Sequence, residues 1–436
     1  MKKLFDSVKK CLLALAVVVT CIASVPTVEA KAVVTSNGSI AKGIDVSKYQ
    51  GQIDWAKVAA SGVKFAFIRI GTIKGGMDPY FLYNIQNAQA NGIKVGVYIY
   101  SYATNVEMAQ LEATLVITWL NEFGLQLPVA YDVEDKCHTA MSTGDLFNMI
   151  NTFCMLIDSA GYYPMVYTYK SFYHGKLGTS PWDKWMAQYN DSLNTSENVA
   201  FWQYSSSGSV PGISGRVDMD YQYKDYSKLI INEGFIDHLG ATRFYRNYKM
   251  QRGWIEYQGK KYYADLLGNI TKGWYLDADG RMYFLDLNDG AVRTGPVEIS
   301  GFTFYFSPEN GGAQQMGFID YGQGMKYFDP FLNGAMSTSW FAYEGKMHYA
   351  DKNGNQAIGL QVIDGISYYF DAEGALFTNG QIELDGVIYV ADANGVLSVL
   401  PQIDLSLIDP NTGLMLDPTT GNWINPYTGE VVVKQP

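Results

Sequence analysis

The chain has 436 residues, 47% of them hydrophobic, so it can bury the cores of two or three domains. Its formal net charge of −11 argues against nucleic acid as a partner and against electrostatic attraction to an anionic surface. The four histidines are scattered and no metal-ligand spacing occurs, so we expect neither a metal nor another cofactor.

Residues 1–30 are typical of a secretory signal peptide. A basic start is followed by the apolar stretch Leu12–Val25 and by a small-residue cleavage site that ends at Ala30. The apolar stretch is short for a membrane span, which needs about 20 residues. Cys21 would permit a lipoprotein, but Thr20 suits a lipobox poorly. We expect an exported, soluble protein without a membrane span.

Two cysteines remain after this segment, Cys137 and Cys154. In an exported protein they could form a disulfide, which would contribute on the order of 3 kcal/mol for a loop of this length. The sequence leaves the pairing open.

Residues 42–226 alternate between strand and helix patterns, which predicts an α/β fold with a parallel sheet. We expect strands at 43–47, 65–70, 95–102, 127–134, 163–169, 184–189, 199–204 and 216–219, and helices at 54–61, 81–90, 106–123 and 145–160. Eight strands with no helices in the final third predict a β/α barrel that has fewer helices than strands.

The fourth of these strands ends in two carboxylates, Asp132 and Glu134. Side chains alternate along a strand, so both should project from one face at its carboxyl end, where α/β folds bind substrate. Two neighbouring carboxylates cannot both ionise freely, and one becomes usable as a general acid. The alternative is a strand end with two solvated acids, because Asp-x-Glu is common by chance.

Two further acids lie on the first and last expected strands. These strands are neighbours in a closed barrel, so Asp45 and Asp218 should converge on the same mouth as Asp132 and Glu134. Like charges repel, and proteins usually carry such a penalty at functional sites. Arg69, at the end of the second strand, could contact substrate or form a structural ion pair.

Aromatic side chains also occur near the strand ends. Flat rings there suit sugar rings, although any one of them could belong to the core. The candidates are Tyr98, Tyr100, Trp185, Trp202 and Tyr204.

Several motifs together resemble family 25 of the glycoside hydrolases, the muramidases named for their Asp-x-Glu motif. The resemblance covers residues 42–226 and rests on segments 43–51, 53–55, 96–98, 131–134, 185–189 and 217–220. It implies a flattened β/α barrel that cleaves the β-1,4 bond after N-acetylmuramic acid in peptidoglycan. It further implies Glu134 as the acid, Asp132 as its partner, and Asp45 and Asp218 as supporting carboxylates.

The same resemblance adds one substrate-binding candidate, Gln188, within the motif at 185–189. One departure concerns Asp220, which stands where the family commonly has Asn. This leaves open whether Asp218 or Asp220 points inward.

After an expected linker at 227–250, glycine and aromatic motifs recur every 20–22 residues over 251–400. Each unit is predicted to be a β-hairpin, and since one hairpin is only marginally stable, neighbours should stack into an all-β solenoid. The motifs begin at Gly253, Gly273, Gly295, Gly317, Ser339, Gly359 and Gly380. A turn-rich tail follows at 401–436, either a wall-contacting segment or a plain disordered end.

These units resemble cell-wall-binding repeats, some of which hold choline in an aromatic cage by cation–π attraction. The candidate wall-ligand residues are Trp254, Tyr262, Trp274 and Trp340, with a cage from the first three. The alternative is that these rings only join hairpins. The resemblance therefore implies a wall polymer as partner, with choline possible but not assured.

The sequence thus predicts a secreted, wall-associated peptidoglycan hydrolase. Two alternatives are an inactive wall-binding lectin or adhesin and a hydrolase of chitin-like glycans. Three mechanisms stay open: Asp132 as a nucleophile with retention, an inverting water, or attack by the substrate's acetamido group with Asp132 orienting it. We favour the acetamido route.

Overall fold

The computed structural model of this chain describes residues 33–35, 38–121, 123–177, 180–195, 197–400, 405–426 and 430–432. The predicted signal peptide lies outside the described residues. The chain divides into two compact units, Met1–Thr271 and Lys272–Pro436. Among the described helices, none is both long and apolar enough to span a membrane.

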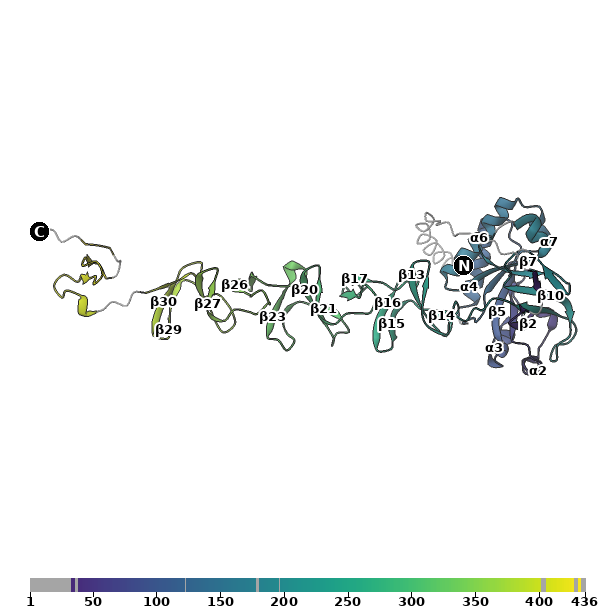
Figure 1. Cartoon of the computed structure of the whole chain (residues 1–436), viewed down its shortest axis with the longest axis horizontal. Helices are drawn as coiled ribbons and strands as arrows, with labels where there is room; N and C mark the ends of the chain where they lie inside the picture. The colour runs from purple at the N-terminus through teal and green to yellow at the C-terminus, as the bar shows by residue number, and fades with distance from the viewer. Residues whose placement is uncertain are drawn as a thin grey trace. The chain divides into compact units, whose positions relative to one another are not determined.

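The first unit contains a closed barrel of eight strands (Figure 1). They are β2 (Ala41–Val46), β3 (Phe65–Thr72), β5 (Lys94–Tyr100), β6 (Val129–Asp132), β7 (Pro164–Tyr169), β8 (Asp183–Ala187), β10 (Phe201–Gly208) and β11 (Val217–Gln222). Their order around the barrel is β2-β11-β10-β8-β7-β6-β5-β3, and the pairing of β2 with β3 closes it. β11 runs antiparallel to both its neighbours, whereas the other barrel pairs are parallel. The predicted barrel is confirmed.

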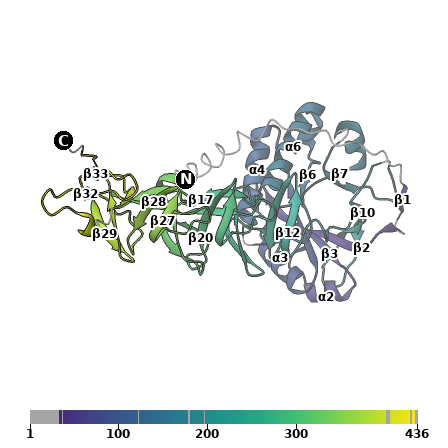
Figure 2. The same cartoon turned by 60° about the vertical axis from the view of Figure 1, so that its left-hand side comes forward.

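Four helices cover the outside of the barrel (Figures 1 and 2). They are α2 (Trp55–Ala60), α3 (Phe81–Ala90), α4 (Val106–Trp119) and α6 (Thr143–Ser159). Asp54 caps α2, since its side chain accepts a hydrogen bond from the Lys57 amide. Only short helical turns occur elsewhere among the described residues of the barrel: α5 (Lys136–Thr139), α7 (Lys170–Phe172), a 3-10 turn at Lys48–Gln50 and a π turn at Tyr173–Leu177. The expected loss of helices after β7 is therefore confirmed.

Alternation along the strands separates two buried layers. Outward residues such as Ile44 and Val46 pack under the helices in one large cluster. Inward residues form an aromatic plug, in which the Phe67 ring stacks on Trp185 with centroids 4.5 Å apart and meets Phe201 edge-on at 4.9 Å. The plug fills the barrel interior, so polar inward residues at the carboxyl ends of the strands face a closed floor.

The stretch expected to be a linker instead carries a three-stranded sheet that packs on the barrel. Its strands are β12 (Glu233–His238), β13 (Ala241–Arg246) and β14 (Lys249–Met250). Asp158 at the end of α6 pairs with His238 at 2.9 Å and with Arg243 at 3.8 Å. These contacts tie the sheet to the barrel, and sequence periodicity missed it because about half of the residues in its strands are polar.

All seven predicted repeat motifs begin β-hairpins in the structure. The pairs are β15–β16 (Gly253–Tyr257, Lys260–Ala264), β17–β18 (Gly273–Leu276, Met282–Leu285), β19–β20 (Gly295–Ile299, Phe302–Ser307), β22–β23 (Gly317–Asp320, Met325–Asp329), β25–β26 (Trp340–Tyr343, Lys346–Tyr349), β27–β28 (Gly359–Ile363, Ile366–Phe370) and β29–β30 (Gly380–Leu384, Val387–Ala391). In one turn, Asp364 and Gly365 have φ of +51° and +81°, as a two-residue hairpin connection requires. The hairpins are confirmed, and a continuous solenoid stays a prediction.

The remaining described strands are short. They are β1 (Val33–Thr35), β4 (Gly76–Met77), β9 (Ser192–Asn194), β21 (Ala313–Gln315), β24 (Ala335–Met336), β31 (Leu397–Val399), β32 (Met415–Leu416) and β33 (Trp423–Ile424). The last two pair as a small hairpin within the turn-rich tail.

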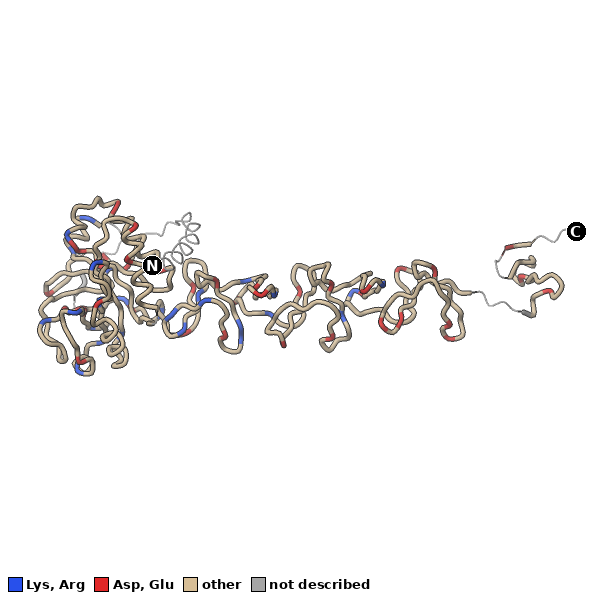
Figure 3. Tube along the Cα trace, turned by 180° about the vertical axis from the view of Figure 1, so that it is seen from behind, with Lys and Arg blue, Asp and Glu red and all other residues tan. Residues whose placement is uncertain are grey.

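Acidic residues recur along the repeats (red in Figure 3), and an aspartate follows the second strand of several of them. The Asp371 carboxylate accepts hydrogen bonds from the backbone amides two and four residues later, and Asp351 and Asp392 do the same. Such side-chain bonds close tight loops. These acids therefore have a structural role in the turns.

The two cysteines that could have paired are both free thiols, and Cys154 is fully buried on the inner face of α6. The disulfide that the sequence left open does not form in this structure.

Candidate active site

The predicted acids meet at one mouth of the barrel. Asp132 ends β6 and Glu134 follows two residues later, while Asp45 lies on β2 directly opposite Asp218 of β11. The antiparallel direction of β11 places its first residues at the end of the barrel where β2 finishes. Asp220, two residues further along β11, is fully buried on the same face. Both Asp218 and Asp220 therefore face inward, which answers the question that the sequence left open.

Asp132 is 3% exposed, and its Oδ1 atom is buried without a hydrogen-bond partner among the described residues. Burial raises the pKa of this carboxyl well above its usual value, and the nearby Glu134 charge raises it further, while Arg69 opposes the shift. A buried carboxyl oxygen without a partner costs stability, so it is suited to receive a group from a ligand.

Glu134 is half-buried beyond the end of β6, and its position is set by Val133. The Val133 amide donates to the Tyr167 carbonyl at 2.9 Å, and the Val133 carbonyl accepts from the Thr168 hydroxyl at 2.7 Å. Burial raises the pKa of Glu134, and Asp218 and Asp135 add to the increase, whereas a hydrogen bond from Tyr167 lowers it. A carboxyl whose protonated form is favoured in this way can act as a general acid.

A hydrogen-bonded chain that the sequence did not predict connects the two sides of the mouth through Gln203. Its Nε2 donates to Asp45 Oδ2 at 2.7 Å, while its Oε1 accepts from the hydroxyls of Tyr167 at 2.9 Å and Tyr189 at 3.0 Å. Gln203 is 3% exposed. The sequence did contain one signal for this chain of hydrogen bonds: a glutamine lies within the apolar run of β10, and a buried amide requires hydrogen-bond partners.

Asp220 accepts a hydrogen bond from the Trp185 indole, whose Nε1 lies 2.8 Å from Oδ1, and its carboxyl also hydrogen-bonds with that of Asp45. Burial raises the pKa of Asp220 to about 8. Burial also raises the pKa of Asp45, and the charges of Asp220 and Asp218 increase that shift. At neutral pH Asp220 is therefore protonated, and it resembles the neutral asparagine expected at this position.

Two of the predicted aromatic residues turn away from the mouth, and a third is buried inside the barrel. Trp185 is 2% exposed inside the plug, and Trp202 is 1% exposed among the outward residues, where its indole donates to the Gln188 carbonyl. Tyr204 stacks on Tyr221 at 4.4 Å, also on the outer side of β10. The assignment of Trp202 and Tyr204 as substrate-binding residues is wrong, because both alternate with the inward Phe201 and Gln203 along the strand. Trp185 points inward and its indole donates to Asp220, so its contact with substrate stays a prediction.

Tyr98 and Tyr100 do lie near the acids. Tyr98 is partly exposed beside Trp185, and the charges of Asp45 and Asp132 add to the effect of burial in raising its pKa. The Tyr100 hydroxyl donates to Asp135 at 3.2 Å. Both remain candidates for contact with substrate.

Arg69 forms the structural ion pair that the sequence offered as one alternative. Its Nε and Nη2 atoms donate to Asp78 Oδ2 at 2.9 and 2.7 Å. The same Asp78 oxygen accepts from the Lys48 amide at 3.0 Å, and the guanidinium lies 5.1 Å from the centroid of the Tyr49 ring. Arg69 therefore holds the loop after β2 in place at the mouth.

A groove of about 430 Å³ adjoins Glu134 between the ends of β7 and β8. Gln188, a predicted substrate-binding residue, lines it, and its Oε1 atom is buried without a partner among the described residues. Tyr189, 56% exposed, and Lys170 also line the groove. The groove is thus a polar extension of the mouth that begins at the candidate acid.

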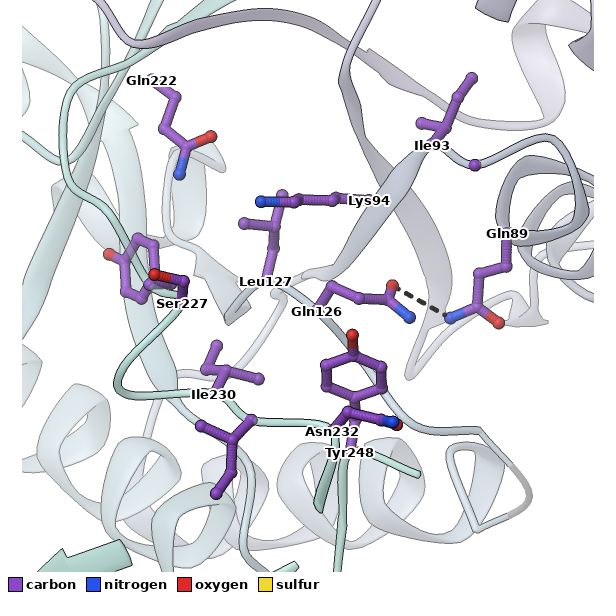
Figure 4. A pocket seen from close by; sticks show the side chains of 13 residues that line it. Gln89, Ile93, Lys94, Gln126, Leu127, Gln222, Ser227, Ile230, Asn232 and Tyr248 are labelled. Carbon is purple, nitrogen blue, oxygen red and sulfur yellow. Dashed lines mark hydrogen bonds between the residues drawn. The ribbon is translucent and has the colours of Figure 1, made fainter. Parts of the chain in front are cut away.

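The second cavity of interest, about 350 Å³, lies at the opposite end of the barrel (Figure 4). Gln89, Lys94, Gln126 and Gln222 line it, together with apolar and uncharged residues. Gln89 donates to Gln126 across it at 3.3 Å. None of the described residues that line this cavity is a carboxylate, so it lacks the groups for acid catalysis.

The four predicted wall-ligand residues have different surroundings. Tyr262 is buried against Phe235, on the face of its hairpin opposite to Trp254. Trp254 instead contacts Tyr263, and the Lys261 ammonium lies 4.1 Å from the centroid of its ring. Tyr262 therefore does not join Trp254 in a cage, because the two alternate to opposite sides of the hairpin.

The other two belong to the second unit. Trp274 packs edge-on against Phe284 and Phe304, with centroids 5.3 and 5.0 Å away, and 42% of its surface is exposed. Trp340 lines a cavity of about 430 Å³ together with Met347, Tyr368 and Lys346. Of the two predicted wall-ligand residues in the second unit, Trp340 is the one that lines this cavity.

Comparisons with known proteins find similarity over the barrel region. The family model for glycosyl hydrolases family 25 matches residues 44–213. The uncharacterized protein YegX of Escherichia coli K12 is 33% identical over 212 residues, which are 46% of this chain and 75% of that protein. The autolytic lysozyme of Clostridium acetobutylicum is 31% identical over 182 residues, 41% of this chain and 55% of that protein.

Among solved structures, the modular autolysin LytC from Streptococcus pneumoniae is similar at 31% identity with a TM-score of 0.38. That match covers 42% of this chain and 46% of LytC. The matched share of LytC and of the Clostridium protein is about half of each.

Proposed function

The chain belongs to family 25 of the glycosyl hydrolases, and on that premise we propose that it hydrolyses the β-1,4 bond between N-acetylmuramic acid and N-acetylglucosamine in peptidoglycan. The observation that carries the proposal is the pair formed by Glu134 and Asp132. Their pKa values are both raised, and the buried Asp132 Oδ1 has no partner among the described residues.

In the proposed reaction, Glu134 donates a proton to the leaving glycosidic oxygen as the bond to the anomeric carbon breaks. Asp132 accepts a hydrogen bond from the acetamido N–H of the sugar, which orients the acetamido oxygen for attack on the anomeric carbon. Water then opens the resulting ring, with Glu134 now taking a proton from it. The unpartnered Oδ1 atom supports this role, since it can receive the N–H without breaking an existing hydrogen bond.

Asp45 and Asp218 would support this pair by binding sugar hydroxyls or by adjusting the local charge. Two other routes need the same residues in different roles. In a retaining displacement Asp132 attacks the sugar, and in an inverting one a water activated by Asp218 attacks from the opposite face.

The hairpin repeats are proposed to hold the enzyme at the cell wall. Tethering raises the local concentration of substrate without changing the chemistry. The Trp340 cavity supports such a role, and the Lys346 ammonium that also lines it lies 4.0 Å from the Asp371 carboxylate. We therefore propose a wall polymer as the ligand, with choline possible but not assured, and an exported, wall-associated location.

Digestion of purified bacterial walls by the full chain tests the proposal. Borohydride reduction followed by mass spectrometry identifies the new reducing ends, with Glu134→Gln as the inactive control. Muramitol is the expected product. Glucosaminitol would identify a different glycan bond, and wall binding without any release would favour the lectin or adhesin alternative.

A further inference from the structure

The groove beside Glu134 contains a positive charge that the proposed reaction does not use. Lys170 follows the last residue of β7 and lines the groove with Glu134 and Gln188. Its ammonium makes no hydrogen bond or ion pair with the described residues, and the residue is partly buried. Among the described residues that line the groove, Glu134 and Lys170 are the only ones with a charged side chain.

The rest of the mouth is strongly acidic. Asp45, Asp132, Asp218 and Asp220 all gather there, and ionised members of this group would repel an anionic substrate. An uncharged sugar needs no cation for binding. A partly buried ammonium without a partner is costly for an enzyme of neutral glycans, and it becomes useful when the substrate carries a negative charge.

We propose that Lys170 binds a carboxylate on the side arm of the muramic acid residue, so that the enzyme selects glycans with an anionic arm. This inference rests on the proposed function and specifies the substrate of the same site. The carboxylate could be the lactyl group itself or belong to a stem peptide attached to it. The buried Gln188 Oε1 can accept an amide N–H or a sugar hydroxyl in the same groove.

Three soluble glycan preparations test this inference with the full chain. The first has bare lactyl carboxylates, the second has the same carboxyls converted to methylamides, and the third bears stem peptides with free carboxylates. We expect kcat/KM to be about tenfold higher for the carboxylate-bearing arm than for the methylamide, since a charge-assisted hydrogen bond has this effect. Added salt should reduce the difference.

Lys170→Gln should remove this preference while the rate on the methylamide glycan stays within about twofold. Lys170→Arg should retain it, which separates loss of charge from loss of fold. Lys64→Gln is the matched control, because Lys64 is an exposed lysine at the amino end of β3, away from the mouth. A preference for the first preparation assigns the lactyl carboxylate, and a preference confined to the third assigns the stem peptide.

Equal rates on all three glycans with the unsubstituted enzyme would overturn the inference and leave the proposed hydrolase intact. The inference would fail equally if the preference persisted in Lys170→Gln. No cleavage of any preparation, together with no muramitol from whole walls, would overturn the proposed function itself.

Discussion

The side-chain amide of Gln203 donates a hydrogen bond from Nε2 to Asp45 at 2.7 Å, and its Oε1 accepts one from the Tyr167 hydroxyl at 2.9 Å. Three barrel strands that are far apart in the sequence, β2, β7 and β10, are joined by this one side chain. Because Tyr167 also neighbours the Glu134 carboxyl, the arrangement couples a supporting acid to the candidate general acid.

Gln203→Ala should lower kcat on soluble muropeptides by about 10–100-fold with little change in KM. The substitution leaves the buried Asp45 without its donor and removes the Gln203 acceptor that competes with Glu134 for the Tyr167 hydroxyl. A stronger hydrogen bond from Tyr167 would lower the pKa of Glu134 further, so the alkaline limb of the pH–rate profile should move to lower pH. Gln52→Ala, at an exposed position, is the control. An unchanged pH profile would show that Gln203 has only a structural role and does not affect the pKa of Glu134.

Glu134→Gln should remove nearly all turnover and leave wall binding intact, because the amide cannot donate the required proton. Asp132→Asn should cost less, since its nitrogen and oxygen can still hold the acetamido group. Steady-state rates on soluble muropeptides and pelleting with intact walls measure the two effects.

Proton NMR of the first-formed anomer distinguishes the mechanisms. The acetamido route and the retaining displacement both give an initial β-anomer. An initial α-anomer would exclude both routes and assign the activation of water to another carboxylate, with Asp218 the first candidate.

Asp220→Asn should stabilise the protein more at pH 8 than at pH 5. Folded Asp220 holds its proton up to about pH 8, whereas the unfolded chain releases it near pH 4, so the unfolded state binds fewer protons between these values. The free energy of unfolding therefore falls as the pH rises through this range, and the uncharged asparagine avoids that loss. We expect a gain in Tm on the order of 5 °C at pH 8, since each kcal/mol shifts Tm by about 2–4 °C.

Calorimetry at both pH values measures this difference. The exposed Asp191→Asn is the matched substitution and should show no comparable pH dependence. A Tm difference for Asp220→Asn that stays constant between pH 5 and pH 8 would contradict the assigned protonation of Asp220.

Glu112→Ala should lower the free energy of unfolding by about 2–4 kcal/mol. The buried Glu112 carboxyl accepts hydrogen bonds from Ser101 Oγ, Tyr131 Oη and the Tyr102 amide at 2.7–2.9 Å. Its removal leaves the Tyr102 amide without this acceptor and the two hydroxyls, 3.0 Å apart, with only each other. Urea unfolding measures the change. Glu107→Ala, at an exposed position on the same helix, should cost less than about 1 kcal/mol, and an equal cost for both would contradict the prediction.

A truncated protein that ends after Thr271 should keep full activity on soluble muropeptides and lose most of its activity on intact walls. A shorter one that ends near Tyr226 should be less stable, because it lacks the β12–β14 sheet and the His238–Asp158 pair. Wall digestion and thermal unfolding compare the two. Equal wall digestion by the full chain and the protein truncated after Thr271 would mean that the repeats do not target the enzyme.

Local sequence patterns were sufficient for most of the secondary structure. The helix predicted at residues 81–90 has those bounds in the structure, and the seven glycine and aromatic motifs each begin a hairpin. These features depend on residues close together in the chain: cap residues, hairpin turns and hydrophobic period. The short strands at 233–250 lack such signals, so the sequence presented them as a linker.

The sequence by itself determined which acids gather at the mouth, because the ends of adjacent barrel strands must meet and Asp132, Glu134, Asp45 and Asp218 stand at those ends. Only the tertiary structure decided which neighbours turn inward with them. A shift of one residue in the register of β10 would turn Trp202 inward in place of Gln203, and although the glutamine in this apolar run signals a buried amide, the register itself is set only by pairing with the neighbouring strands. The Gln203–Asp45 hydrogen bond spans 158 positions, so it exists only once the barrel has closed.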